Sequence, residues 1–94
     1  MAPGDICLAR FPLGDAPGMK LCPVLLLAGP IGPIPEVLVA YISSVVPPVL
    51  LPSDVLVDPA QPKFRSTNLK AVSVLRLHKL ATIHARNVDS MVTA

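Results

Sequence analysis

The sequence has few charges, few aromatic side chains and few cysteines, and each shortage removes a class of protein. Charged residues make up 15% of the 94 residues, aromatic residues make up 3%, and tryptophan is absent. Cys7 and Cys22 are the only cysteines and do not form a CxxC pair, so they cannot build a structural zinc site by themselves. We expect both to be reduced, packed thiols, and we expect no metal and no cofactor.

The chain also lacks an uninterrupted apolar run of the length that crosses a membrane. Residues 37–53 carry no charge, but Ser43 and the Pro47-Pro48 pair interrupt them, and a span needs about 20 apolar residues. The first ten residues include Asp5 and have no apolar core, so no signal peptide is visible. We therefore expect a cytoplasmic protein that does not contact a membrane.

Apolar residues are abundant, at 52% of the chain. A chain of this length is expected to form one domain over residues 1–94 and to bury only about two-thirds of its unfolded surface. An apolar excess in so small a domain favours an interface with a second copy, so we expect a homodimer.

Twelve prolines and five glycines divide the chain into short segments rich in Val, Ile and Leu. Long helices do not fit between such breaks, whereas short strands do. The pattern predicts strands over residues 5–11, 22–28, 36–44, 50–58, 72–79 and 82–84, long loops over 13–19 and 59–68, and a short helix after residue 86. Because βαβ spacing is missing, the expected fold is mainly β: a small closed antiparallel barrel with a short C-terminal helix.

Positive charge gathers in the second part of the sequence. Residues 1–59 contain two basic and five acidic residues, while residues 60–94 contain six basic residues and one acid. This asymmetry suggests a polyanionic partner, nucleic acid before membrane, although solvated loop lysines explain half of it. The loop at 59–68 combines Lys63 and Arg65 with the aromatic Phe64, which suits contact with a strand of nucleic acid.

Common catalytic motifs are absent, so catalysis would depend on dispersed side chains. Arg76 and His78 lie two residues apart on a predicted strand, which puts their side chains on one face about 6–7 Å apart. A fixed cation beside a group that titrates near neutral pH suits metal-free RNA cleavage. The alternative is an exposed Arg-x-His on an amphipathic strand. Asp5 and Asp54 are expected to bind turn amides rather than to act as acids or bases.

Five short segments, in order along nearly the whole chain, resemble the PemK/MazF-like toxins of bacterial toxin–antitoxin systems. They are Gly4-Asp5-Ile6 with Phe11-Pro12, KLCPVL at 20–25, AYIS at 40–43, LPSDV at 51–55 and SVLRLHKLATI at 73–83. The resemblance implies an SH3-like barrel that dimerises and cuts single-stranded messenger RNA without a metal, leaving a 2′,3′-cyclic phosphate. It also implies a cognate antitoxin protein that blocks the RNA groove.

The resemblance assigns roles by position. Ser43 stands where many members place a Thr or Ser near the scissile phosphate, and Arg76 stands at a catalytic arginine. His78 stands where those members have an acidic residue, and histidine can replace that acid as a proton carrier. Cys22 occupies the position of a phosphate-binding arginine, and loss of one such donor commonly costs about 10²–10³ in rate. Lys20, two residues earlier, supplies part of that charge without the guanidinium fork.

Three hypotheses follow for the function. In the first, the chain is an endoribonuclease with Arg76, His78 and Ser43 as catalytic residues. Its RNA-binding residues would be Lys20, Cys22, Lys63, Arg65 and Lys79. In the second, the arginine-to-cysteine exchange at position 22 marks a protein that binds RNA or an antitoxin without cutting. In the third, the same kind of barrel acts as a poison of another protein, although no residue favours this.

Overall fold

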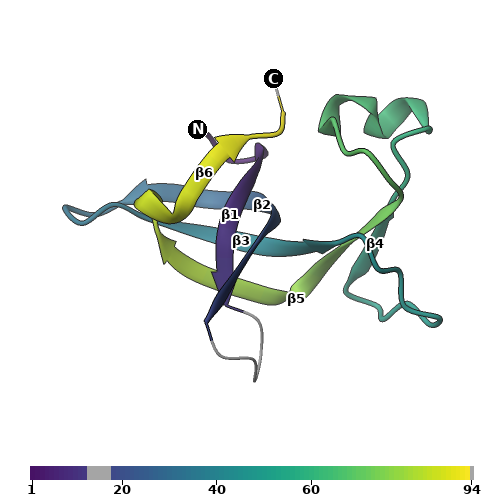
Figure 1. The fold of residues 1–94 in the computed structure, drawn as a ribbon, viewed down its shortest axis with the longest axis horizontal. Coiled ribbons are helices and arrows are strands. Elements are labelled where there is room, and N and C mark those ends of the chain that lie inside the picture. Colours follow the sequence, from purple (N-terminus) through teal and green to yellow (C-terminus); the bar gives the residue numbers. More distant parts are fainter. Residues whose placement is uncertain (13–17, 94) are drawn as a thin grey trace.

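The computed structural model describes residues 1–12 and 18–93, which form one six-stranded antiparallel sheet (Figure 1). The strands are β1 (Ile6–Pro12), β2 (Met19–Ile31), β3 (Glu36–Ser43), β4 (Asp54–Val57), β5 (Ser73–His84) and β6 (Val88–Met91). Their spatial order is β4-β5-β3-β2-β1-β6, which leaves β4 and β6 as the two edges. The prediction of a mainly β fold is confirmed, and the sheet is not closed.

One face of the sheet carries the core, because apolar residues alternate with polar or partly exposed ones along β1, β2 and β3. Cross-strand pairing of Ala9 with Cys22 and of Val24 with Tyr41 brings these side chains to the same face. We call it the inner face. Its core is Cys7, Ala9, Phe11, Cys22, Val24, Leu26, Val37, Val39 and Ile83. Both cysteines are buried free thiols, as expected.

The irregular end of β2, where its pairing with β3 shifts register, requires glycine at position 29. Gly29 has a φ of +103°, and a Cβ atom built there would lie 2.6 Å from the carbonyl oxygen of Glu36. An L side chain is strained at this φ, and that contact is too close for any real Cβ. Gly29 therefore lets the end of β2 approach β3 closely.

The third and fifth strands pair with an irregular register. Sequence patterns predict two strands, 72–79 and 82–84, but β5 is continuous from Ser73 to His84. Ala40 pairs with Leu80, whereas the next residue, Tyr41, pairs with Arg76, so Leu77, His78 and Lys79 form a bulge. One half of β5 therefore completes the core, while the other half reaches out to β4 (Figure 1).

The expected C-terminal helix is wrong for the residues up to 93. A 3-10 turn, η2 (Ala85–Asn87), leads directly into β6, which pairs with β1. The backbone N–H of Val92 and the hydroxyl of Thr93 extend this contact to Ile6. Pairing with β1 gives the backbone groups of this segment hydrogen-bond partners, whereas an isolated helix of one or two turns is only marginally stable.

The two expected long loops differ in outcome. Residues 13–17 of the first lie outside the described part of the chain. The second contains a 3-10 helix, η1 (Pro62–Thr67), which ends at Asn68 with a left-handed φ of 57°. Within residues 1–12 and 18–93, no helix is long and apolar enough to cross a membrane.

Candidate functional site

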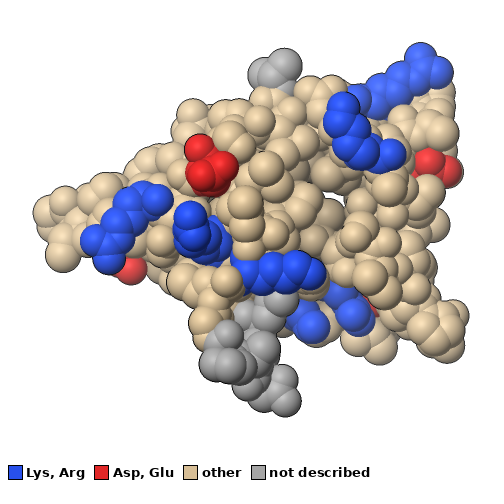
Figure 2. Space-filling model, viewed as in Figure 1, with Lys and Arg blue, Asp and Glu red and all other residues tan. Residues whose placement is uncertain are grey.

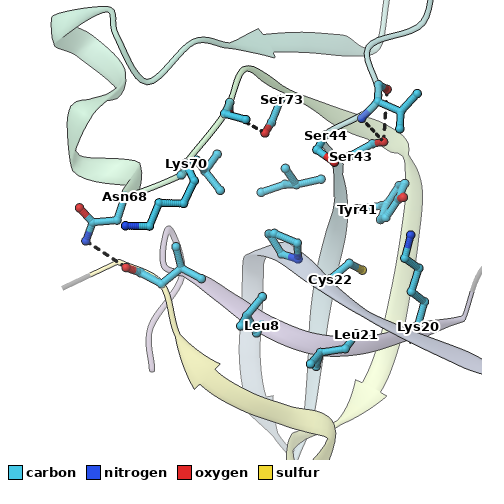
Figure 3. A pocket seen from close by; sticks show the side chains of 16 residues that line it. Leu8, Lys20, Leu21, Cys22, Tyr41, Ser43, Ser44, Asn68, Lys70 and Ser73 are labelled. Carbon is cyan, nitrogen blue, oxygen red and sulfur yellow. Dashed lines mark hydrogen bonds between the residues drawn. The ribbon is translucent and has the colours of Figure 1, made fainter.

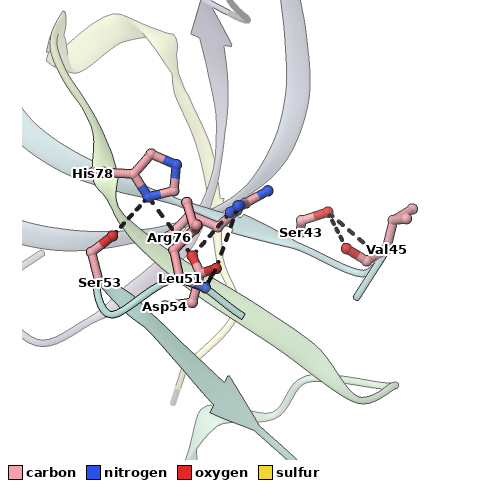
Figure 4. Close-up of polar contacts among 7 residues, drawn as sticks. All are labelled: Ser43, Val45, Leu51, Ser53, Asp54, Arg76 and His78. Carbon is pink, nitrogen blue, oxygen red and sulfur yellow. Dashed lines mark hydrogen bonds and ion pairs between the residues drawn. The ribbon is translucent and has the colours of Figure 1, made fainter. Parts of the chain in front are cut away.

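A buried carboxylate on β4 is the centre of the polar cluster in Figure 4. Asp54 Oδ1 lies 3.0 Å from Nε of Arg76, and Asp54 Oδ2 lies 3.3 Å from Nη2 of Arg76. The Asp54 side chain is inaccessible to solvent, while the Arg76 side chain is 18% exposed. This is a bidentate ion pair through Nε and Nη2 of Arg76, and the Nη1 group lies outside it.

The turn before β4 also holds this carboxylate. The backbone N–H of Leu51 donates to Asp54 Oδ2 at 2.8 Å. That hydrogen bond, together with the guanidinium of Arg76, lowers the pKa of Asp54 below its ordinary value. The expectation that Asp54 binds a turn amide is therefore confirmed, and Asp5 does the same with the N–H of Ala2.

His78 reaches the same cluster through one ring nitrogen. Its Nδ1 lies 3.0 Å from the hydroxyl oxygen of Ser53 and 3.7 Å from Asp54 Oδ1. The His78 side chain is 34% exposed. With a proton on Nδ1, facing these two oxygens, Nε2 keeps its lone pair and can accept a proton from a ligand.

The strands explain why these side chains meet. Asp54 is directly opposite Arg76 in the β4–β5 pairing, and their side chains therefore share a face. The bulge at 77–79 carries His78 back to that carboxylate, and the N–H of Leu77 bonds to the carbonyl of Ser53. We refer to Ser53, Asp54, Arg76 and His78 as the Asp54 cluster.

A second feature is a mainly apolar cavity of about 460 Å³, within the size range of small-ligand pockets (Figure 3). Its wall is formed by side chains of β1, β2 and β3 and by the segment 68–73 that follows η1. The apolar lining includes Leu8, Leu21, Pro23, Ile42, Leu69 and Val92, and the polar lining includes Lys20, Ser43, Ser44, Asn68 and Lys70. In Figure 3, Lys20 and Tyr41 lie at one end of the cavity and Asn68 and Lys70 at the other.

Three of the predicted site residues, Lys20, Cys22 and Ser43, line this apolar cavity. The Ser43 hydroxyl is already engaged, because it accepts from the N–H of Val45 at 3.1 Å and approaches the carbonyl of Val45 at 3.2 Å. Burial raises the pKa of the Cys22 thiol to about 11, so the thiol is neutral at physiological pH. Position 22 therefore supplies no charge to the cavity.

Arg76 and His78 do not line the apolar cavity, so the structure divides the predicted catalytic set in two. The two parts meet at Tyr41, which lines the cavity and pairs with Arg76 across the strands. Tyr41 stacks on Phe11 at a centroid distance of 5.4 Å, and the Lys79 ammonium lies 5.7 Å from its ring centroid. Lys79 is thus close to both parts.

The two remaining predicted RNA contacts lie on η1. Lys63 lies over the Phe64 ring at 5.1 Å. Arg65 lines a second cavity, of about 540 Å³, together with Asn68, Lys70 and Met91. We call this the basic cavity, because it is lined by two cationic side chains.

Sequence reasoning missed several residues that matter at these sites. Ser53 and Tyr41 lie in predicted strands and in two of the five segments that resemble the family, but the sequence pattern gives neither residue a role in a site. Asn68 ends the predicted loop at 59–68, and Lys70 lies just after it; neither residue was assigned a role. Asp54 had a visible signal, since an acid after Pro52-Ser53 at a strand start favours a turn, but its pairing with Arg76 is a tertiary contact.

No protein-family model matches this chain, and no curated protein matches it.

Proposed function

We propose that this chain is a toxin of the PemK/MazF type that binds single-stranded RNA and cuts it without a metal. The observation that carries the proposal is the anchored imidazole of His78. Ser53 and Asp54 occupy its Nδ1 side, which leaves Nε2 to exchange a proton with a ligand. Arg76 supplies a guanidinium end beside it, and the five-segment resemblance and the basic second part of the sequence support RNA as the ligand.

In the proposed reaction, Nε2 of His78 removes the proton from a ribose 2′-hydroxyl. The 2′-oxygen attacks the adjacent phosphorus, the bond from phosphorus to the 5′-oxygen breaks, and that oxygen leaves with a proton from water. The products are a 2′,3′-cyclic phosphate and a 5′-hydroxyl end. The free Nη1 end of Arg76 would stabilise the charge that develops on the phosphorane oxygens.

The first test is cleavage of single-stranded RNA in the presence of EDTA, with detection of cyclic-phosphate ends. His78→Gln should lower the rate at least about 10²-fold, because it removes the proton acceptor. His84→Gln is the matched control, since His84 only accepts from the backbone N–H of Arg86. Intact RNA at high wild-type concentration, or equal losses in the two variants, would contradict the proposal.

A second candidate function is binding of RNA or an antitoxin without cutting. Three observations favour it: Asp54 neutralises most of the Arg76 charge, Cys22 is a buried neutral thiol, and the Asp54 cluster lies outside the apolar cavity. Cys22→Arg separates the two candidates. If wild type is inert and Cys22→Arg cuts RNA, the chain is a binding protein that has lost one cation; cutting by wild type excludes this second candidate.

The remaining expectations belong to the same proposal. The proposal also includes the SH3-like barrel of the family, a second copy that covers part of the exposed apolar surface, and a cognate antitoxin protein that competes with RNA in the cytoplasm. Sedimentation of the purified chain tests the homodimer, and a single species at 9.9 kDa would contradict it.

A further inference from the structure

The apolar cavity and the basic cavity adjoin along the segment after η1. Asn68, Leu69, Lys70 and Val92 line both of them. Figure 2 shows Lys and Arg side chains over the corner of the molecule that holds η1, and a hollow between that corner and the sheet. We call the two adjoining cavities together the groove; it is apolar on the sheet side and cationic on the η1 side.

The cations of this groove are available for a ligand. In residues 1–12 and 18–93, the only basic side chains with a nitrogen within 4.0 Å of a carboxylate oxygen are Arg76 and His78, which both face Asp54. Arg65 and Lys70 thus have no acidic partner in that part of the chain. Two such cations in one concave site attract an anion that both can contact, such as a phosphodiester.

Asn68 fixes the segment at which the two cavities meet. Its side-chain amide donates to the carbonyl of Val92 at 3.0 Å, which ties the segment after η1 to the strand end near the C-terminus. The left-handed φ of 57° at Asn68 turns the chain so that Leu69 and Lys70 lie at both cavities. The amide oxygen of Asn68 still has acceptor capacity for a ribose hydroxyl or a base amino group.

We propose that this groove binds one nucleotide unit of single-stranded RNA, with its phosphate between Arg65 and Lys70 and its unpaired base in the apolar cavity. This inference rests on the proposed function for its choice of RNA. An apolar cavity of about 460 Å³ beside two cations suits the flat aromatic face of a base that is joined to a phosphate. A base inside a duplex is not free to enter the cavity, and a glutamate-rich peptide has no side chain that fills it.

The test measures binding separately from cutting. The probe is a fluorescent six-nucleotide RNA with 2′-O-methyl groups, which has no 2′-hydroxyl and cannot be cleaved. Its dissociation constant is measured by anisotropy across a salt series. The Arg65→Gln, Lys70→Gln double variant should weaken binding at least about tenfold at low salt and lower the salt slope by about 0.7, since the one lost phosphate contact in a single strand contributes about 0.7.

The matched control removes the same charge from outside the groove. Arg10→Gln with Arg86→Gln also lowers the net charge by two, but neither residue is among the proposed RNA contacts, and neither lines either cavity. This control should keep the wild-type salt slope within about 0.3. Equal slopes in the two double variants would overturn the proposal, because binding would then follow net charge alone.

Two further probes test the class of ligand. An oligomer with abasic sites should bind wild type at least about tenfold more weakly, because the apolar cavity would stay empty. A hexaglutamate peptide that binds more tightly than the RNA, and loses that binding in the Arg65→Gln, Lys70→Gln variant, would overturn the RNA assignment in favour of an acidic protein.

The outcomes separate this inference from the proposed function. If the chain never cuts RNA but the slope falls only in the groove variant, the groove assignment stands and the endoribonuclease is wrong. If the chain cuts RNA and the groove variant keeps the wild-type slope and affinity, the groove assignment is wrong and the endoribonuclease stands.

Discussion

The sheet body and the arm at 44–57 are both rich in apolar residues, but they use them differently. In the body, Leu26, Val37 and Val39 are completely buried. In the arm, Val45 and Val49 are 77% and 76% exposed. The arm is joined to the body through β4, in which Val57 alone is a buried apolar side chain, and through the Asp54 cluster. High hydrophobicity in a small chain therefore does not locate its core; the pairing of strands does.

The largest expected effect is loss of a body side chain. Leu26→Ala leaves a cavity in the inner-face core and should lower the free energy of unfolding by about 2–5 kcal/mol, with a fall in Tm of at least about 10 °C. Leu56→Ala, in the half-exposed β4 of the arm, is the control and should cost less than about 1 kcal/mol. Equal losses in urea denaturation would show that body and arm are packed alike.

A smaller loss is expected at the end of β2. Gly29→Ala places a Cβ against the Glu36 carbonyl at a φ of +103°, so the backbone there must shift. We expect a loss of about 2 kcal/mol, more than the usual benefit of replacing glycine by alanine. Gly4→Ala, which also has positive φ but open space around it, controls for the backbone strain alone. If the two variants unfold at the same temperature, the close contact with Glu36 carries no cost.

The link between arm and body should depend on pH. The folded pKa of Asp54 is lowered, so its ionised form stabilises the fold at any pH above the unfolded value of about 3.9, and this contribution is lost as pH falls through the folded pKa. The difference in unfolding free energy between wild type and Asp54→Asn should be largest near neutral pH and shrink below about pH 4. Asp58→Asn is the control for removal of one carboxylate, and a difference that grows on acidification would contradict the ion pair.

The smallest effect is expected on the exposed side of the arm. Val49→Ser should change the free energy of unfolding by less than about 0.5 kcal/mol, because the side chain is already in water. Measurement at several protein concentrations sharpens the comparison. A loss of unfolding free energy that appears only at high protein concentration would assign the arm to contact with a second copy. A loss of about 2–5 kcal/mol at all concentrations, as for a core side chain, would place Val49 inside the body.

Much of the fold followed from the sequence, because alternation along β1 and apolar runs in β2 and β3 depend only on which face is buried. The β6 strand was missed, since pairing with β1 depends on an open edge 80 residues away in the chain rather than on local propensity. The continuous β5 was split for a related reason. Its bulge is a property of the pairing with β3, and no residue in Leu77-His78-Lys79 marks it.

The site was predictable only in part. Arg76 and His78 do converge, but on a carboxylate that the spacing argument did not include, because Asp54 arrives from another strand. Ser43, Lys20 and Cys22 do share a cavity, but that cavity is bounded by Asn68 and Lys70, which lie at least 25 residues further along the chain. Positions on one strand can be ordered from sequence, whereas distances between strands depend on register.

The bulge in β5 makes that strand resistant to sliding. Displacing β5 along β3 would move Arg76 away from Tyr41 and Asp54. The buried Asp54 carboxylate would then lack its cation. The sheet therefore favours the one alignment of β3 and β5 in which Asp54 keeps its ion pair with Arg76.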